Sequence, residues 1–171
     1  MKLIALPGRN PETESWMAEL TGALALGQTE TLITRYRHWD AVVDPDVQGE
    51  AARLQLAADD VVIAKSLGTL VLLASTLIRP APAYAIFIGT PILHYPDESL
   101  ALLCDLAAQT PCLFIQQTAD FTGGFACLSE RLGDVPAAAL EEVPGEDHIY
   151  ADTEELAGIV TRWWSELSCG G

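Results

Sequence analysis

Three residues of the types that cooperate in nucleophilic catalysis occur in the order Ser66, Asp120 and His148, each just after a segment that is predicted to be a short strand. A serine hydroxyl becomes a nucleophile when a histidine removes its proton, and a carboxylate fixes the tautomer of that histidine. Such chemistry transfers an acyl group from a carbonyl compound to the serine and then to water. Because the chain has only three histidines, one at this position is informative.

Ser66 lies at the centre of the string Ala-Lys-Ser-Leu-Gly, between a β-branched run at 61–64 and an apolar stretch at 67–78. This pattern predicts a buried strand, a sharp turn and a helix. The small residues Ala64 and Gly68 would let the two backbones approach closely. Free N–H groups at the start of the helix suit a developing oxyanion. The alternative interpretation is a serine that caps an ordinary helix.

The rest of the chain alternates short apolar runs with helical patterns. Strands are expected at 2–6, 31–36, 61–64, 84–88, 112–116 and 138–143, and helices at 12–26, 49–58, 67–78, 99–109, 125–132 and 152–167. Such alternation predicts an α/β fold, a three-layer sandwich with a mostly parallel sheet of about six strands. At 171 residues we expect a single domain over 1–171.

The string around Ser66, with its strand and helix, resembles the nucleophile elbow of the α/β-hydrolase family, where Gly-x-Ser-x-Gly is usual and Ala64 replaces the first glycine. The resemblance covers nearly the whole chain. In that family the acid follows a strand in the C-terminal half and the histidine follows the last strand. Asp120 follows the strand at 112–116 and His148 follows the last strand, so the resemblance implies the acid and the base.

The resemblance also implies an oxyanion hole made of two backbone N–H groups. By position these belong to Leu67 and Arg9, and Gly8 would let the backbone approach. Relatives often carry histidine where this chain has proline before Gly8, and Arg9 is alternatively a solvated loop residue. The residues expected to line the pocket are Gly8, Lys65, Pro91 and His94. Packing on the flank of the turn is the alternative for Lys65.

Only about nine residues, 89–97, separate the strand at 84–88 from the next helix. This spacing leaves no room for a helical cap, so the chain resembles the small, lidless, esterase-like serine hydrolases. An open pocket suits a small-molecule acyl substrate or an acyl group exposed on a larger molecule. We expect cleavage of an ester, thioester or amide without a metal or organic cofactor. The alternative is a catalytically inactive binding protein with the same fold, because fold does not determine function.

The formal net charge of −15 argues against a nucleic-acid partner and against an anionic membrane surface. The first apolar run is too short for a signal peptide, and the stretch at 67–78 is too short to span a bilayer, so we expect a cytoplasmic protein. The four cysteines have no metal-ligand spacing. A flavodoxin-like fold that binds a nucleotide phosphate at the start of the helix after Ser66 is a third interpretation. Oligomeric state is left open.

Overall fold

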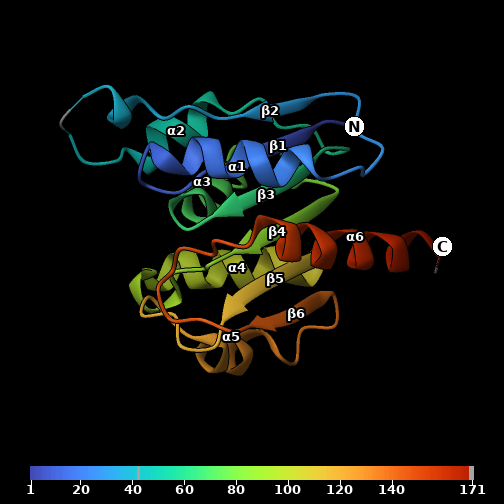
Figure 1. The fold of residues 1–171 in the computed structure, drawn as a ribbon. Helices are drawn as coiled ribbons and strands as arrows, with labels where there is room; N and C mark the ends of the chain where they lie inside the picture. Colours follow the sequence, from blue (N-terminus) through green and yellow to red (C-terminus); the bar gives the residue numbers. More distant parts are fainter. Residues whose placement is uncertain (42, 170–171) are drawn as a thin grey trace.

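The computed structural model describes residues 1–41 and 43–169. In these residues six strands form one sheet, in which every neighbouring pair is parallel and the order is β2-β1-β3-β4-β5-β6 (Figure 1). The strands are β1 (Leu3–Leu6), β2 (Thr31–Ile33), β3 (Val61–Lys65), β4 (Tyr84–Ile88), β5 (Cys112–Gln117) and β6 (Ala138–Val143). The predicted α/β fold with a parallel sheet of about six strands is confirmed.

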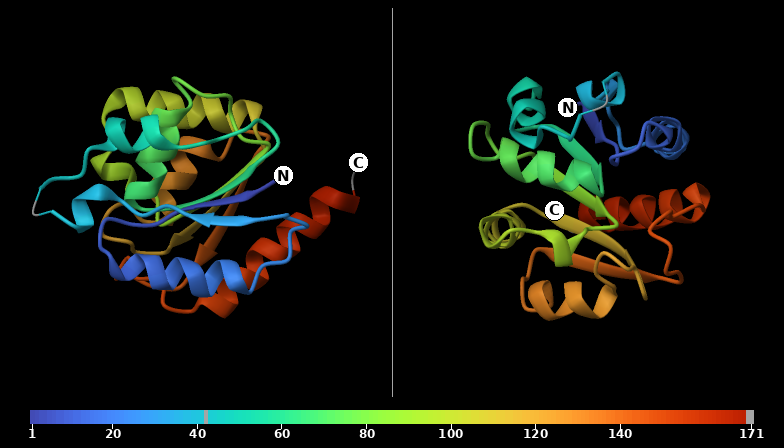
Figure 2. Two further views of the ribbon diagram at one scale, coloured as in Figure 1. Left: turned by 90° about the horizontal axis from the view of Figure 1, so that it is seen from above. Right: turned by 90° about the vertical axis from the view of Figure 1, so that its left-hand side faces the viewer.

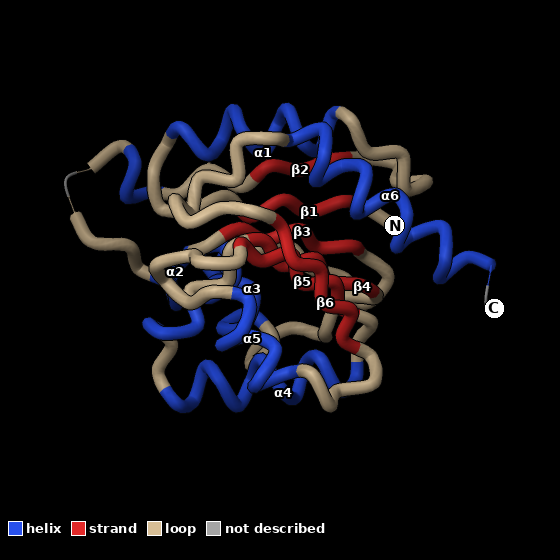
Figure 3. The backbone as a smooth tube through the Cα atoms, turned by 60° about the horizontal axis from the view of Figure 1, so that its bottom comes forward, coloured by secondary structure: helices blue, strands red, loops and turns tan. Residues whose placement is uncertain are grey.

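Helices cover both faces of the sheet and make it the middle of three layers (Figures 2 and 3). One face carries α1 (Glu12–Gly22) and α6 (Thr153–Cys169). The other face carries α2 (Val47–Arg53), α3 (Leu67–Ser75), α4 (Asp97–Gln109) and α5 (Phe125–Leu132). Two short 3-10 turns are η1 (Arg37–Trp39) and η2 (Ile92–His94). Within residues 1–41 and 43–169, no helix combines the length and apolarity needed to cross a bilayer.

The four inner strands, β1, β3, β4 and β5, are largely apolar because helices bury both faces of the sheet there, whereas the edge strands β2 and β6 are partly exposed. Successive strand residues point to opposite faces, so the sheet separates two apolar cores. Ala5 contributes to the core beneath α1 and α6, whereas its neighbour Leu6 contributes to the core beneath α2 to α5. In the second core Phe87 and Phe114 stack on adjacent strands with ring centroids 4.6 Å apart. A sheet packed in this way is a rigid support for its end loops.

The chain reverses direction across the sheet between β1 and β3, because β2 lies on one side of β1 and all later strands lie on the other. In open α/β sheets ligands bind beside such a reversal, at the carboxyl ends of the strands. The right-hand view of Figure 2 faces this edge. The loops after β1, β3, β5 and β6 all begin there, and the last of them crosses the edge before α6 (Figure 1).

Four elements have bounds that differ from those predicted by the sequence pattern. The expected helices 12–26, 49–58 and 67–78 correspond to α1, α2 and α3, and the expected strand 31–36 corresponds to β2, with the bounds given above. The second strand ends early because Tyr36 turns into the core, where its hydroxyl donates a hydrogen bond to the carbonyl of Pro7 at 3.0 Å. The α2 helix begins early because the Asp46 carboxylate accepts the N–H of Gly49 at 2.9 Å.

The β1 and α3 backbones approach closely at Gly68, and its replacement by alanine should destabilise the fold. A Cβ at Gly68 would lie 2.2 Å from the carbonyl oxygen of Leu6, which is backbone and has little freedom to move. We expect Gly68→Ala to lower the free energy of unfolding by about 1–3 kcal/mol, measured by urea denaturation. Gly158→Ala is the matched control in α6, where a Cβ meets nothing within 4 Å.

The control variant should be more stable than the wild-type protein by about 0.5–1 kcal/mol, because alanine has a higher helix propensity than glycine at an exposed position. Equal urea midpoints for Gly68→Ala and the wild-type protein would show that the contact between the two backbones is not tight.

Candidate active site

Ser66 occupies the sharp turn between β3 and α3 in a strained backbone conformation. Its φ is 49° and its ψ is −113°, values that a non-glycine residue adopts only when its surroundings impose them. The Ser66 N–H donates to the carbonyl of Ile88 at 3.1 Å, which joins the turn to β4. The side chain makes no capping hydrogen bond to α3, so the structure does not support the interpretation as an ordinary helix cap.

A continuous chain of hydrogen bonds links Ser66, His148 and Asp120. The Ser66 hydroxyl lies 2.8 Å from Nε2 of His148, and Nδ1 of His148 lies 2.7 Å from Oδ2 of Asp120. An imidazole that donates its Nδ1 proton to Asp120 leaves Nε2 free to accept the Ser66 proton. These residues come from loops separated by 82 and 28 positions in sequence. We refer to this arrangement as the Ser–His–Asp chain.

The Asp120 carboxylate is buried and accepts hydrogen bonds at both oxygens. Besides His148, Oδ2 accepts the Tyr150 hydroxyl at 2.8 Å, and Oδ1 accepts the backbone N–H and the hydroxyl of Thr122 at 2.8 and 2.7 Å. Burial raises the pKa of Asp120, but the hydrogen bonds from His148 and Thr122 together lower it by more than burial raises it. The pKa of Asp120 is therefore below its ordinary value. The group is therefore a carboxylate at neutral pH.

The loop between β6 and α6 carries His148 in an unusual backbone conformation. His148 and Tyr150 both have φ of 60°, the left-handed region that non-glycine residues avoid. The His148 N–H donates to the Gln117 side chain at 2.9 Å, and Asp147 accepts hydrogen bonds from the Gln117 side chain and the Ile149 N–H. Those two bonds lower the pKa of Asp147. Asp147 thus shapes the loop, and Asp120 is the carboxylate that contacts the imidazole.

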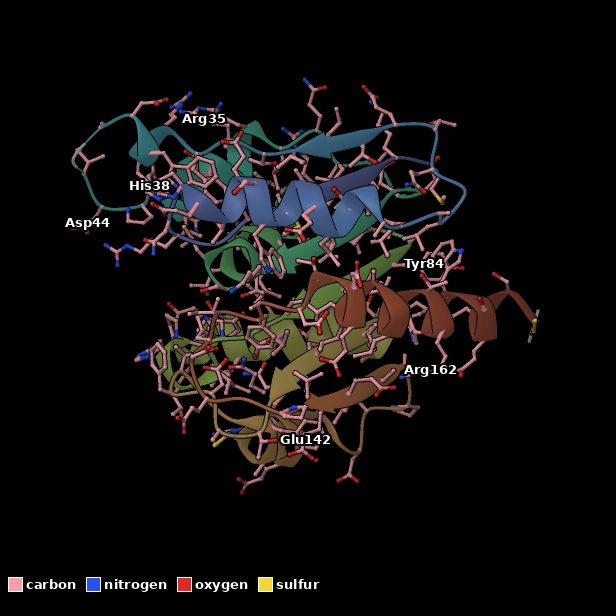
Figure 4. The ribbon with its side chains drawn as sticks, viewed as in Figure 1. Arg35, His38, Asp44, Tyr84, Glu142 and Arg162 are labelled. Atoms are coloured by element: carbon pink, nitrogen blue, oxygen red, sulfur yellow. The ribbon has the colours of Figure 1, made fainter. Side chains whose placement is uncertain are left out.

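The loop after β1 is held from the segment between β2 and α2. The carbonyl of Arg9 accepts Nε1 of Trp39 at 2.8 Å and lies 2.7 Å from Nε2 of His38. The Arg9 guanidinium forms an exposed ion pair with Asp44 at 3.1 Å. Figure 4 shows His38 and Asp44 at this end of the molecule. The backbone of Arg9 is therefore fixed, while its charged group points to solvent and is paired.

A cleft of about 630 Å³ opens above Ser66, between the loops after β1 and β3 and the loops that carry Asp120 and His148. Its position matches the reversal point of the sheet. Its walls combine aromatic and aliphatic side chains with a few charged ones. The residues that line it are Gly8, Arg9, Asn10, Glu12, Thr13, Trp16, Lys65, Ser66, Phe121, Asp147, His148 and Ile149.

Two of the four predicted pocket residues line this cleft, and two do not. Gly8 and Lys65 are in its wall, whereas Pro91 and His94 are absent from it, so the prediction for that pair is wrong. The reason is the direction that η2 takes. After β4 the chain turns towards the loop that follows β5, where the Leu93 N–H donates a hydrogen bond to the carbonyl of Thr122. This turn leaves Pro91 buried and places His94 at a separate depression between α2, α3 and α4.

Metal ligands are not grouped in the part of the chain that the structure describes: no three His, Cys, Asp or Glu side chains there form a set that could hold a metal ion. The four cysteines are unpaired, and Cys112, the first residue of β5, is buried in the core beneath α2 to α5. Burial raises the pKa of the Cys112 thiol to about 12. This cysteine is therefore a packing residue.

Sequence reasoning missed several residues that complete the site. Thr122 was detectable, because an aspartate often accepts hydrogen bonds from the residue two positions later. Tyr150 and Trp16 gave no such signal: the Trp16 indole N–H donates to the carbonyl of Tyr150, 134 positions away, at 2.8 Å. Phe121 and Ile149 are exposed apolar neighbours of the Ser–His–Asp chain and flank the cleft.

Comparison with known proteins identifies the fold. No protein-family model matches the chain, and no curated protein shows significant sequence similarity. A crystal structure from Pectobacterium atrosepticum, of a protein provisionally described as a YdeN-like hydrolase, is similar with a TM-score of 0.66 and 15% sequence identity. The match covers 97% of this chain and 91% of the other. The chain therefore has a hydrolase-like, three-layer α/β fold.

Proposed function

We propose that the protein is a serine hydrolase that cleaves esters, or related thioesters or amides, through an acyl-enzyme on Ser66. The observation that carries the proposal is the Ser–His–Asp chain, with distances of 2.8 and 2.7 Å between consecutive partners. The strained turn at Ser66 and the depressed pKa of Asp120 support it, because both prepare the groups before substrate binds. The hydrolase-like fold agrees with it.

In the proposed reaction His148 Nε2 removes the Ser66 proton as Oγ attacks the acyl carbonyl carbon. The tetrahedral oxyanion then collapses, the bond to the leaving group breaks, and the imidazolium gives its proton to that group. Water, deprotonated by His148, attacks the acyl-Ser66 ester in the same way and releases the carboxylic acid. Asp120 stabilises the imidazolium in both halves and keeps its Nδ1 proton in place.

The oxyanion would be stabilised by backbone N–H groups. Leu67 is the first residue of α3, and the first N–H groups of a helix have no partner within it. Arg9 is proposed as the second donor, because the loop after β1 lines the same cleft as Ser66. Hydrogen bonds to the carbonyls of Pro7 and Arg9 hold this loop on both sides of the Arg9 N–H. A fixed donor needs no reorganisation during the reaction.

The cleft favours an apolar acyl group of modest size. Its volume of about 630 Å³ is within the range of small-molecule sites, and Trp16, Phe121 and Ile149 supply apolar walls. Phe121 is 68% exposed, so the cleft is open at its rim and could also receive an acyl group carried on a larger molecule. We expect faster turnover of p-nitrophenyl butyrate than of the acetate, because the longer chain buries more apolar surface.

The proposal is tested by fluorophosphonate labelling of the purified protein. Intact mass spectrometry should show one covalent adduct per chain, and peptide mapping should place it on Ser66. A protein that stays unlabelled beside a reactive serine hydrolase would refute the proposal and favour the inactive binding protein.

Absorbance spectra of the same preparation address the nucleotide-binding alternative. The first five strands share their order with flavodoxin-like folds, so strand order does not decide between them. A bound flavin or nucleotide, released on denaturation, would favour that alternative.

A further inference from the structure

Lys65 immediately precedes Ser66, and the proposed reaction does not use it. The chain has only two lysines, Lys2 and Lys65, and Lys65 is 3% exposed. Burial lowers the pKa of Lys65 to about 8, although the carboxylates of Asp120 and Asp147 raise it. A charged group is unfavourable in such surroundings unless it gains specific contacts. An apolar residue would continue β3 without this penalty, so packing alone does not explain a lysine here.

The Lys65 ammonium is held in a clamp of two aromatic rings and one carbonyl group. Its Nζ lies 5.4 Å from the centroid of the Trp16 ring and 5.1 Å from that of Tyr150, within the range of cation–π attraction. The same Nζ donates a hydrogen bond to the carbonyl of His148 at 2.9 Å. The clamp thereby connects β3, α1 and the loop after β6.

The backbone that accepts this bond is the part of the site that most needs support. His148 and Tyr150 have positive φ, a conformation that persists only when surrounding contacts maintain it. The Gln117 side chain holds the His148 N–H and Lys65 holds the His148 carbonyl, so both polar backbone groups of the residue are fixed. Each constraint limits where the imidazole can lie relative to Ser66.

We propose that Lys65 is a positioning residue: its ammonium, held between Trp16 and Tyr150, fixes the His148 backbone so that the imidazole faces Ser66. This inference rests on the proposed function, because it assigns Lys65 a role in the same reaction. A displacement of the base by about 1 Å is enough to reduce the rate on the order of 10²-fold. Lys65 contributes here through its contact with His148, and it is not itself a group that reacts.

The charge of Lys65 predicts opposite effects of pH on activity and on stability. The Lys65 ammonium is faced by titratable groups from two loops: Asp120 after β5, and Asp147, His148 and Tyr150 after β6. The charged residues Glu12 of α1 and Arg9 line the same cleft, and the neighbouring Trp16 carries no charge. Above pH about 8 the ammonium loses its proton, and both the cation–π contact and the charge-assisted hydrogen bond weaken. We therefore expect turnover to decline as pH rises through about 8.

Stability should change in the other direction. The folded-state pKa of about 8 is below the unfolded value of about 10.4, so between these values the unfolded chain binds more protons. The contribution of Lys65 to the free energy of unfolding therefore rises with pH in this window.

The first test replaces Lys65 with methionine, which keeps the length of the side chain and removes the charge. We expect kcat for a p-nitrophenyl ester and the rate of fluorophosphonate labelling to fall about 10- to 100-fold, with KM within about threefold. The decline in activity above pH about 8 should disappear, and the thermal midpoint should not decrease.

Lys2→Met is the matched control, because it removes the other lysine, which forms an ion pair with Glu30 at 3.3 Å. It should retain the wild-type kcat and alkaline decline. A lysine with only a structural role would lower the midpoint of Lys65→Met and leave the pH profile unchanged. Wild-type kcat and an unchanged alkaline decline in Lys65→Met would also overturn the inference.

A second measurement does not depend on activity. Protein labelled with ¹³C-lysine should give two Cε signals, and the one lost in Lys65→Met should titrate near pH 8. The proton between His148 and Asp120 should give a downfield ¹H signal, which is assigned by its loss in His148→Ala. In Lys65→Met this signal should broaden, because the loop that carries His148 becomes mobile.

The two measurements separate the two proposals. An inert wild-type protein whose downfield signal depends on Lys65 would refute the proposed reaction and retain the positioning role. A reactive protein in which neither rate nor signal changes in Lys65→Met would refute the role of Lys65 alone, and an inert protein with an unchanged signal would refute both.

Discussion

Replacing Ser66 with alanine is expected to lower turnover of a p-nitrophenyl ester by on the order of 10⁴- to 10⁶-fold and to abolish fluorophosphonate labelling. The substitution removes the oxygen that lies 2.8 Å from Nε2 of His148 and leaves the Cβ at the turn unchanged. The fold should therefore persist, as judged by circular dichroism and urea denaturation. Turnover is measured by the absorbance of released nitrophenol and labelling by intact mass.

Ser165→Ala is the control, because Ser165 is exposed on α6 and its hydroxyl donates to the carbonyl of Thr161 at 2.8 Å. It should retain full turnover and labelling. His148→Ala should lose as much activity as Ser66→Ala, and the double variant should be no worse than either, because nucleophile and base act as one unit. Persistent labelling of Ser66→Ala would place the reactive group elsewhere.

Replacing Asp120 with asparagine is expected to lower kcat about 10⁴-fold. All four hydrogen bonds that the structure gives this carboxylate come from donors: His148, Tyr150 and two groups of Thr122. An asparagine amide would direct its NH₂ group at some of these donors in either orientation. Where the NH₂ group faces Nδ1 of His148, the neutral imidazole must carry its proton on Nε2. Nε2 can then no longer accept the Ser66 proton.

Asp147→Asn provides the comparison, because Asp147 adjoins His148 in sequence yet bonds to Gln117 and the Ile149 N–H. We expect a loss of at most about tenfold for this variant, since only the loop is affected and not the tautomer. The two variants are compared by kcat and by the rate of fluorophosphonate labelling. Equal losses in both would contradict the assignment of Asp120 as the orienting carboxylate.

The proposed function depends on the site and not on the fold. The strand order of this sheet is compatible with more than one class of α/β protein, and a match at 15% identity shares a fold without sharing every residue. The proposal rests on the turn at Ser66 and on the hydrogen bonds of the Ser–His–Asp chain.

The amino-acid sequence was sufficient to predict the architecture and the neighbourhood of the site. Alternating apolar runs and helical patterns predicted the parallel sheet, because local periodicity and short connections leave few other topologies. Ser66, Asp120 and His148 each follow a strand, and parallel strands end at one edge. This rule was enough to expect the three residues at that edge without any knowledge of distances.

Only the tertiary structure decided which side chains meet there. The direction of η2 removed Pro91 and His94 from the cleft, because a short turn can leave a sheet edge in several directions that local sequence does not distinguish. The clamp around Lys65 joins this residue of β3 to α1 and to the loop after β6. Lys65 and His148, which share a hydrogen bond, are 83 positions apart in sequence. Such contacts depend on the packing of whole layers, which periodicity along the chain does not encode.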